Sequence, residues 1–196
     1  MGAPSAYDSI VASSVIGHTP DLLGFLRSCE TLLTRTGRLI LAVPDKRHCF
    51  DVFQPLTSTG TVLRAHLDGR TRPAPGIIFD DVAYNAVRDG MIGWSATDAG
   101  PLIFFAPLQA ATDAYNSALA MPGYRDVHVW RFVPSSFRLI AHDLNANRPD
   151  CAARGVLSRQ RRQRVLHALV SRRIWVPGRP ADPCATGDAG AGEDFA

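Results

Sequence analysis

Lysine is almost absent from this sequence. Of the 21 basic residues in the 196-residue chain, only Lys46 is a lysine, and the others are arginines. Residues 1–150 contain 13 basic and 14 acidic residues, whereas residues 151–196 contain eight basic and four acidic ones. The net charge of +3 therefore comes entirely from the tail. Because nucleic-acid binding relies on positive charge, a segment that binds nucleic acid is expected in the tail alone.

Long apolar runs, leader-like segments and metal-binding spacings are also missing. No run approaches the roughly 20 apolar residues of a membrane span, and no basic start followed by an apolar stretch opens the chain. The four cysteines lack C-x-x-C spacing, the six histidines lack H-x-x-x-H and H-x-H spacing, and no G-x-S-x-G turn occurs. We therefore expect a cytoplasmic protein with reduced thiols, without a metal site, a disulfide framework or a membrane association.

The first 43 residues predict a βαβ unit. Apolar residues make up 46% of the chain, which is enough for the core of one domain. Tyr7–Ser13 is typical of a parallel strand that is covered on both faces. Thr19 and Pro20 predict a helix start, with Thr19 as the N-cap. Gly37 is expected to end that helix, and Arg38–Val43 to form a second strand.

The residues after this unit predict helices with connections rich in proline and glycine. Helical spacing of apolar residues occurs in three segments before a further strand and a last helix. The three segments are Thr59–Leu67, Asp80–Val87 and Leu108–Met121, the strand is Val127–Phe132, and the last helix is Pro134–Leu144. No strand is expected after Phe132.

The βαβ unit and its continuation carry a family resemblance. The segments that carry it read YDSIVASSVIGH, PDLLGFLRSCETLLTRTGRLILAVP, DKRHCFDVFQPLTSTGTVLRAH, PAPGIIFDDVAYNAV and DVHVWRFVPSSFRLIAHDL. Over residues 6–147 the chain resembles the C-terminal part of a class I S-adenosylmethionine-dependent methyltransferase, type 11-like. The first two segments are similar to that family's fourth strand, the next helix and the fifth strand. The resemblance implies an α/β fold with a partial Rossmann-like methyltransferase sheet, made of strands four and five plus a late strand, and a helical insertion.

The resemblance also implies an activity and a cofactor. The family transfers a methyl group from S-adenosylmethionine, and the bacterial subgroup often occurs near glycan and cell-surface biosynthesis, so a small-molecule or glycan-related acceptor is expected. In the family, a glycine-rich turn and an acidic residue hold the cofactor, and both precede strand four. Because the sequence begins at strand four, we expect this chain alone to bind the cofactor poorly and to be weakly active or inactive. A non-catalytic module that a partner chain completes is the alternative, and the exposed edge of the sheet is where association is expected.

The segment after the first strand holds the predicted cofactor-binding residues. Ligands of open α/β sheets bind beyond the carboxyl ends of the strands, and Ser13, Ser14 and His18 lie there. In the family this segment often ends in Glu-His beside the cofactor; here Gly17 stands in place of the glutamate. We predict that all three residues bind the cofactor and that His18 is also catalytic, handling a proton. The alternative is a loop histidine that supports the start of the helix.

The segment after the second strand holds the predicted acceptor-binding residues. Asp45, Lys46 and Arg47 follow the strand end directly. Lysine and arginine are suited to phosphate and carboxylate groups, so we predict that these residues bind an anionic or glycan-linked acceptor. A solvated charge cluster at a strand end is the alternative.

Carboxylates further along the chain are candidates for a general base. We predict Asp80 as a catalytic residue that removes a proton from a hydroxyl or amine, with Asp81 and Asp51 as further candidates. The alternative for Asp80 is an acid that stabilises a helix N-terminus. Strand alternation places His128 on the face opposite Arg131, which indicates a packed histidine.

The tail is expected to be a separate segment. We divide the chain into a methyltransferase-like part, residues 1–147, and a tail, residues 148–196, which is first rich in arginine and then in proline, glycine and alanine. The family has two antiparallel strands after the last helix. Reading residues 156–172 one nucleotide later permits a strand-turn-strand sequence, which leads to the hypothesis that the tail is out of frame; a disordered tail is the alternative. Nucleic-acid binding by the seven arginines of residues 154–173 is a further, less favoured alternative.

Overall fold

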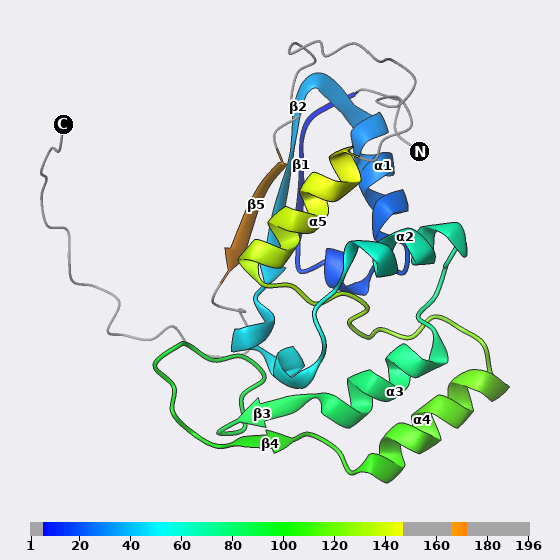
Figure 1. Ribbon diagram of the computed structural model, residues 1–196, viewed down its shortest axis with the longest axis vertical. Coiled ribbons are helices and arrows are strands. Elements are labelled where there is room, and N and C mark those ends of the chain that lie inside the picture. Colours follow the sequence, from blue (N-terminus) through cyan, green and yellow to red (C-terminus); the bar gives the residue numbers. More distant parts are fainter. Residues whose placement is uncertain (1–5, 147–165, 172–196) are drawn as a thin grey trace, which may run out of the picture.

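The computed structural model describes residues 6–146 and 166–171. It shows a mixed α/β chain in which a small sheet lies beside helices, and a hairpin and a helix pair lie apart from that sheet (Figure 1). The strands are β1 (Tyr7–Ser13), β2 (Leu33–Pro44), β3 (Ala86–Arg88), β4 (Leu102–Phe104) and β5 (Leu166–Ser171). The helices are α1 (Leu22–Leu32), α2 (Thr59–Leu67), α3 (Pro75–Tyr84), α4 (Leu108–Ala120) and α5 (Pro134–Ala146), with short 3-10 turns η1 (Ile16–His18), η2 (Lys46–His48) and η3 (Phe50–Phe53).

The larger sheet has the order β1-β2-β5, and both strand pairs are parallel. The predicted βαβ unit is therefore present, but the prediction that both faces of its first strand are covered is wrong. Along β2 the buried residues alternate with less buried ones, and on β1 Ala12 is buried whereas Val11 is 69% exposed. This alternation is that of a sheet packed on one face only.

The expectation that no strand follows Phe132 is also wrong. β5 lies within the arginine-rich segment and pairs with β2 from Leu39↔Leu166 to Pro44↔Ser171. The pairing is parallel, whereas the family resemblance implies antiparallel strands after the last helix. The rest of the tail lies outside the described residues.

The ends of α1 differ from the prediction. Asp21, not Thr19, is the N-cap, because its carboxylate accepts a hydrogen bond from the Gly24 backbone N–H at 2.8 Å. The helix ends at Leu32, and Gly37 lies inside β2. A Cβ atom at Gly37 would lie 2.9 Å from the Tyr7 carbonyl oxygen, so the glycine permits the close approach of the two strands.

The helices after the βαβ unit follow the periodicity with one shift. α2 has the predicted bounds, and a capping box of Ser58 and Thr61 fixes its start. α4 and α5 also agree within two residues with the prediction. α3 begins at Pro75 rather than at Asp80, because proline suits the first helical turn. The end of the predicted segment, Val87, belongs to β3 instead.

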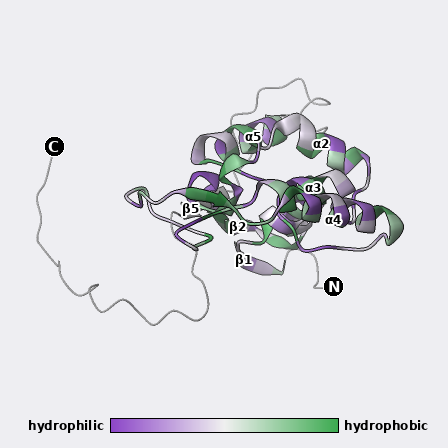
Figure 2. Ribbon diagram, turned by 90° about the horizontal axis from the view of Figure 1, so that it is seen from below, coloured by the Kyte–Doolittle hydropathy of each residue, from purple (hydrophilic) through white to green (hydrophobic). Residues whose placement is uncertain are grey.

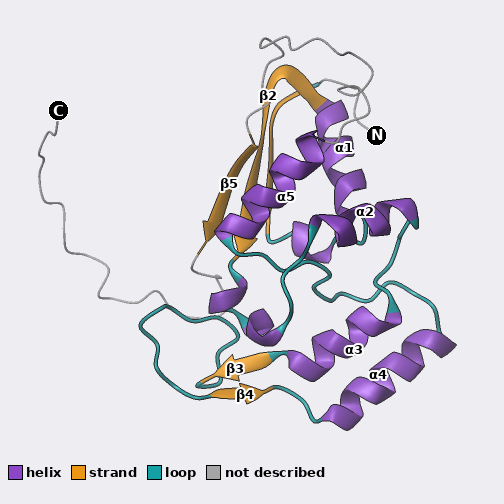
Figure 3. Cartoon of the chain, viewed as in Figure 1, coloured by secondary structure: helices purple, strands orange, loops and turns teal. Residues whose placement is uncertain are grey.

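The main core joins the sheet to α1, α2 and α5. Its members come from β1, η1, β2, these three helices and the segment 129–132. Figure 3 shows α3, α4 and the β3–β4 hairpin in the lower part of the molecule, and α3 packs against α4. Figure 2 shows hydrophilic and hydrophobic residues sharing the surface of the helices, as expected for helices with one buried side. Within the described residues, no helix combines the length and the hydropathy needed to cross a membrane.

The predicted strand Val127–Phe132 is an extended segment and not a ladder strand. A single bridge, Asp45↔Phe132, joins it to the end of β2. Its other backbone bonds go to loops, since the N–H groups of Val129 and Trp130 both donate to the Gly17 carbonyl, at 2.6 and 3.2 Å. The segment therefore crosses the carboxyl edge of the sheet and brings its side chains to the loops there.

Candidate functional site

The carboxyl edge of the sheet gathers most of the residues predicted to form the site. Ser13 and Ser14 are exposed at the end of β1, and Ser14 has a left-handed backbone with φ of 54°. Such a conformation is uncommon for serine and costs of order 1–3 kcal/mol. The Ser14 N–H donates to the Ala42 carbonyl at 2.9 Å, which holds this bend against β2. The chain then turns into η1, which ends at His18.

The three residues predicted to bind the acceptor are engaged within the loop after β2. Asp45 is 2% exposed, and its carboxylate accepts hydrogen bonds from the backbone and side chain of Arg47, the shortest at 2.5 Å from Nη2. Burial raises the pKa of Asp45, but the hydrogen bonds and the charge of Arg47 outweigh it, so the pKa lies below its usual value. Lys46 Nζ donates to the Val52 carbonyl at 2.8 Å. Of the three side chains, that of Arg47 is exposed, and its guanidinium group is already paired with Asp45.

Four charged or titratable side chains form a network beneath this edge. His128 Nδ1 lies 2.5 Å from Asp51 Oδ2, and Arg131 Nε donates to Asp51 Oδ1 at 3.1 Å. Arg131 Nη2 lies 3.6 Å from Asp81 Oδ1, which also accepts from the His128 backbone N–H at 3.3 Å. Asp51, His128 and Arg131 are each less than 10% exposed. The prediction that His128 and Arg131 lie on opposite faces is wrong, because the segment is not a flat strand and both side chains reach Asp51.

The two carboxylates of the network differ in their electrostatics. Burial raises the pKa of Asp51, but the hydrogen bond and charge of His128 and the charge of Arg131 outweigh burial, so the pKa lies below its usual value. Burial raises the pKa of Asp81, and the Arg131 charge opposes this without overcoming it. Asp51 is thus held ionised as the partner of His128 and Arg131, whereas Asp81 takes up a proton more readily.

His18 joins this network to the surface. Its ring lies edge-on to the His128 ring, with centroids 4.5 Å apart. Its Nδ1 atom lies 2.8 Å from Asp126 Oδ1, and its side chain is 32% exposed. The Tyr124 hydroxyl donates to the His18 carbonyl at 3.3 Å. Since Asp126 faces Nδ1, Nε2 is the ring nitrogen that remains for exchange of a proton with a ligand.

Cys49 lies beside the network but is not a nucleophile. Its thiol is fully buried and donates to Asp51 Oδ2 at 3.8 Å. Burial and the neighbouring Asp51 charge raise the pKa of this thiol to about 12. Since the thiolate is the reactive form, Cys49 has a structural role at neutral pH.

Asp80 lies apart from His18, in a shallow hollow between α3 and α4. Gly76, Phe79 and Tyr115 also line this hollow, which has a volume of about 350 Å³. Burial raises the pKa of Asp80, as it does for Asp81. The two predicted catalytic residues are therefore not in one cluster, and Asp81 is the neighbour that reaches the network. Among residues 6–146 and 166–171, no group of His, Cys, Asp and Glu is arranged to hold a metal ion.

Two members of the site had no signal in the local sequence pattern. Asp126 and Tyr124 follow α4 in a loop without periodicity, and they contact His18 from more than 100 positions away. By contrast, the sequence gives a reason to expect partners for His128 and Arg131. Both stand in an apolar run, where a buried polar or charged side chain needs a partner. Asp51 and Asp81, both candidate bases in the sequence, supply those partners.

Gly17 is the tightest point of the site. A Cβ atom at this position would lie 3.3 Å from Cδ2 and 3.4 Å from Nε2 of His128. We expect Gly17→Ala to displace the imidazole and to lower the free energy of unfolding by about 1–3 kcal/mol. Urea unfolding followed by circular dichroism measures this. The matched control is Gly76→Ala in the first turn of α3, where a Cβ meets nothing within 4 Å; an equal loss in both variants would contradict the prediction.

Comparison with known proteins found no matching family model, no matching curated protein and no matching solved structure. The function is therefore argued from the site.

Proposed function

We propose that the chain takes part in methyl transfer from S-adenosylmethionine to a hydroxyl or amine of a small-molecule or glycan-related acceptor, with His18 accepting the proton. The observation that carries the proposal is the half-exposed His18 at the carboxyl edge of a parallel βαβ unit, where ligands of such sheets bind. The methyltransferase resemblance of residues 6–147 supplies the reaction class. In this proposal β1 and β2 correspond to strands four and five of a Rossmann-like methyltransferase sheet.

The proton transfer follows from the contacts of His18. Methyl transfer to a hydroxyl or amine releases a proton from the attacking oxygen or nitrogen. The Asp126 carboxylate, 2.8 Å from Nδ1, stabilises the positive charge that forms on the imidazole when Nε2 takes that proton. Behind it, the His128 ring is held by Asp51 and packs edge-on against His18, so the ring of His18 is supported on its inner side. A fixed ring lowers the entropy cost of alignment with the acceptor.

The cofactor fits these residues only in part. S-adenosylmethionine supplies an electrophilic methyl group on a sulfonium, and the exposed residues Ser13 and Ser14 offer hydroxyl groups in the segment between the end of β1 and His18. However, neither the hollow beside Asp80 nor a smaller one beside Phe50 borders these serines, and the part of the chain that the structure describes has no glycine-rich turn that would accept the methionine end. We therefore assign the proton transfer to this chain and expect it to bind the cofactor only weakly.

His18→Gln tests the proposal. With methyl-labelled S-adenosylmethionine at millimolar concentration and a panel of hydroxyl and amine acceptors, we expect slow label transfer by the full chain. The variant is expected to transfer label about 10²–10⁴-fold more slowly, because general-base catalysis contributes that factor. The control is His142→Gln on α5, whose side chain is 79% exposed. Absence of transfer by the unaltered chain, or equal rates for the two variants, would overturn the proposal.

A second candidate function, an interaction module, rests on the outer edge of β1. β1 pairs only with β2 in the described residues, and Val11 is 69% exposed on the uncovered face of this edge strand. An unpaired apolar edge favours addition of another strand. We expect the chain to self-associate through it and Val11→Lys to be monomeric, as measured by sedimentation velocity. A monomeric unaltered chain would count against this function.

A further inference from the structure

Strand β4 is the free edge of the smaller sheet. Within the described residues it pairs with β3 alone, in antiparallel orientation (Figure 3). The Phe105 N–H donates to the Asn85 carbonyl at 2.8 Å. Because bonded and non-bonded pairs alternate along an antiparallel ladder, the backbone groups of Ile103 also point toward β3, whereas those of Leu102 and Phe104 point outward. Among the described residues these outward groups have no backbone partner, so β4 can accept one more strand.

The other side of β3 is occupied. Arg88 and Met91 exchange both backbone hydrogen bonds, at 3.0 and 2.9 Å. The backbone groups of Arg88 thus face away from β4, which agrees with the outward direction of those of Leu102 opposite it. The chain after Met91 continues against η3, where the Phe50 N–H donates to the Ile92 carbonyl at 2.9 Å. Within the part of the hairpin that the structure describes, the outer side of β4 is therefore the place where a strand can be added.

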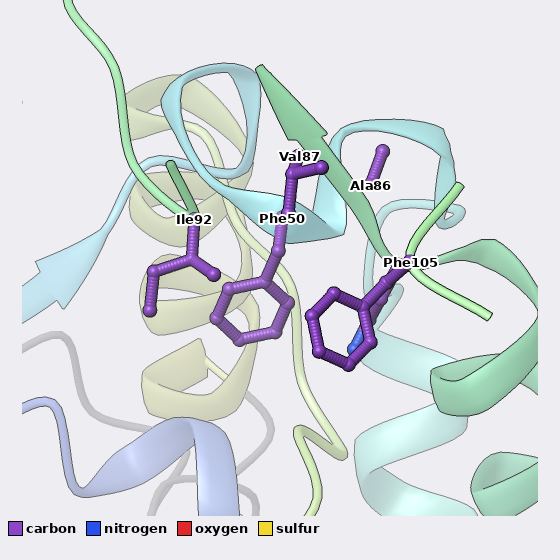
Figure 4. Close-up of a pocket in the computed structure, with 6 residues that line it drawn as sticks. Phe50, Ala86, Val87, Ile92 and Phe105 are labelled. Atoms are coloured by element: carbon purple, nitrogen blue, oxygen red, sulfur yellow. The ribbon is translucent and has the colours of Figure 1, made fainter. Parts of the chain in front are cut away.

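The side chains of this edge are apolar and exposed. Ile103, Phe104 and Phe105 are 60%, 55% and 72% exposed, and residues 101–108 contain no charged residue. Alternation places Ile103 and Phe105 on one face of the hairpin, and Figure 4 shows the Phe105 ring turned toward Phe50. Natural sheet edges are usually protected by charged residues or by covering elements. An edge without either is typical of a surface that binds another chain.

The part of the molecule that carries this edge is acidic. Residues 75–126 contain six aspartates and two arginines. Both arginines are engaged, because Arg88 lies over the Trp94 ring at 5.2 Å and Arg125 Nη2 donates to Ser117 Oγ at 2.7 Å. The exposed aspartates are Asp89, Asp98, Asp113 and Asp126. This charge attracts a basic partner, whereas it repels nucleic acid, an anionic membrane surface and a second copy of the same acidic part.

These features together select one kind of partner. The outward backbone groups require an extended chain, the exposed side chains require apolar residues on it, and the acidic surroundings favour basic ones. We propose that β4 binds an extended segment of a partner protein in which apolar and basic residues alternate, and that this segment is added as a further strand. Its apolar row lies beside Ile103 and Phe105, and its basic row faces solvent near the aspartates. The proposal does not depend on methyl transfer, since binding is measured without a cofactor.

Two blocked synthetic peptides of about eight residues test the proposal. One alternates valine with lysine, and the other alternates valine with glutamate. In calorimetric titration of the full chain, we expect saturable binding of the lysine peptide and at least about tenfold weaker binding of the glutamate peptide, because only the first is attracted by the aspartates. Added salt is expected to weaken the binding. No saturable binding of the lysine peptide, or equal affinity for the two peptides, would overturn the proposal.

Phe104→Pro and Phe104→Ala separate strand addition from attraction to an acidic surface. Both remove the exposed ring, but only proline also removes the outward N–H, and an edge strand tolerates proline where the N–H faces solvent. We expect the proline variant, with unchanged circular dichroism, to bind the lysine peptide at least about tenfold more weakly than the alanine variant. Equal binding by the two would overturn strand addition. Val11→Lys should bind the peptide as the unaltered chain does; a loss there would place the peptide on β1 and overturn the assignment to β4.

Discussion

Asp51→Asn is expected to lower the free energy of unfolding by about 3–5 kcal/mol at pH 7, because it leaves buried partners unpaired. Asp51 accepts from Arg131 on one oxygen and contacts His128 Nδ1 with the other. An asparagine has one acceptor, so its amide group faces a donor on one of the two sides. Arg131 then remains as a buried guanidinium whose nearest acid, Asp81, is 3.6 Å away. Urea unfolding measures the loss.

The pH dependence separates this effect from mere loss of packing. Because the folded pKa of Asp51 lies below the unfolded value, its contribution is present above about pH 4 and is lost as the pH falls through the folded pKa. The stabilities of Asp51→Asn and the unaltered chain should therefore converge in acid. A difference that stays constant with pH would contradict the electrostatic origin.

Asp81→Asn is the matched control, since it makes the same chemical change beside the same arginine. The folded pKa of Asp81 lies above the unfolded value, so its ionisation costs stability as the pH rises from about 4 through the folded pKa. The variant removes this cost and keeps an oxygen for the His128 backbone N–H. We therefore expect it to be as stable as the unaltered chain at pH 7 or more so. A loss equal to that of Asp51→Asn would show that any change in the network has the same effect.

The local sequence pattern was sufficient to predict helices and strands that bury one side against an element close to them in the sequence. The apolar spacing of Thr59–Leu67 and the capping residue Ser58 gave α2 its observed bounds. The two strands of the βαβ unit were likewise found, because each carries a short apolar run and they pair in sequence order. The predicted start of α3, at Asp80, lies inside the helix, because the observed helix begins at Pro75, a residue that favours the first helical turn.

Contacts between residues that are distant in the sequence decide the parts of the fold and of the candidate site that local pattern does not predict. The segment 127–132 alternates like a strand, yet its N–H groups bond to the loop at Gly17 and not to a neighbouring strand. That placement, and not the alternation, decides that His128 and Arg131 share Asp51. Similarly, Lys46 and Arg47 are the residue types that bind an anion, but Arg47 pairs with Asp45 and Lys46 donates to the Val52 carbonyl, so the fold uses both to close their own loop. Residue type and strand position thus predicted which side chains gather at this edge of the sheet, whereas the partners of each side chain required the tertiary structure.

Phe132 anchors the segment on which the site depends. Its ring is 1% exposed and packs at right angles to Phe137, with centroids 5.1 Å apart. Its carbonyl accepts from the Lys46 N–H at 2.9 Å, which fixes the segment to the end of β2. We expect Phe132→Ala to lower the free energy of unfolding by about 3–5 kcal/mol, through lost burial and the cavity left behind. Chemical denaturation measures this.

The control is Phe104→Ala, which also breaks an aromatic pair, here with Phe53 at 5.2 Å, but at a position 55% exposed. Its expected loss is below about 1 kcal/mol, because little burial is removed. Since His128 and Arg131 lie on the same segment as Phe132, the Phe132 variant should also weaken the pairing with Asp51. A Phe132→Ala/Asp51→Asn double variant is therefore expected to lose less stability than the sum of the single losses. Strict additivity would mean that Phe132 supports the core without positioning the buried network.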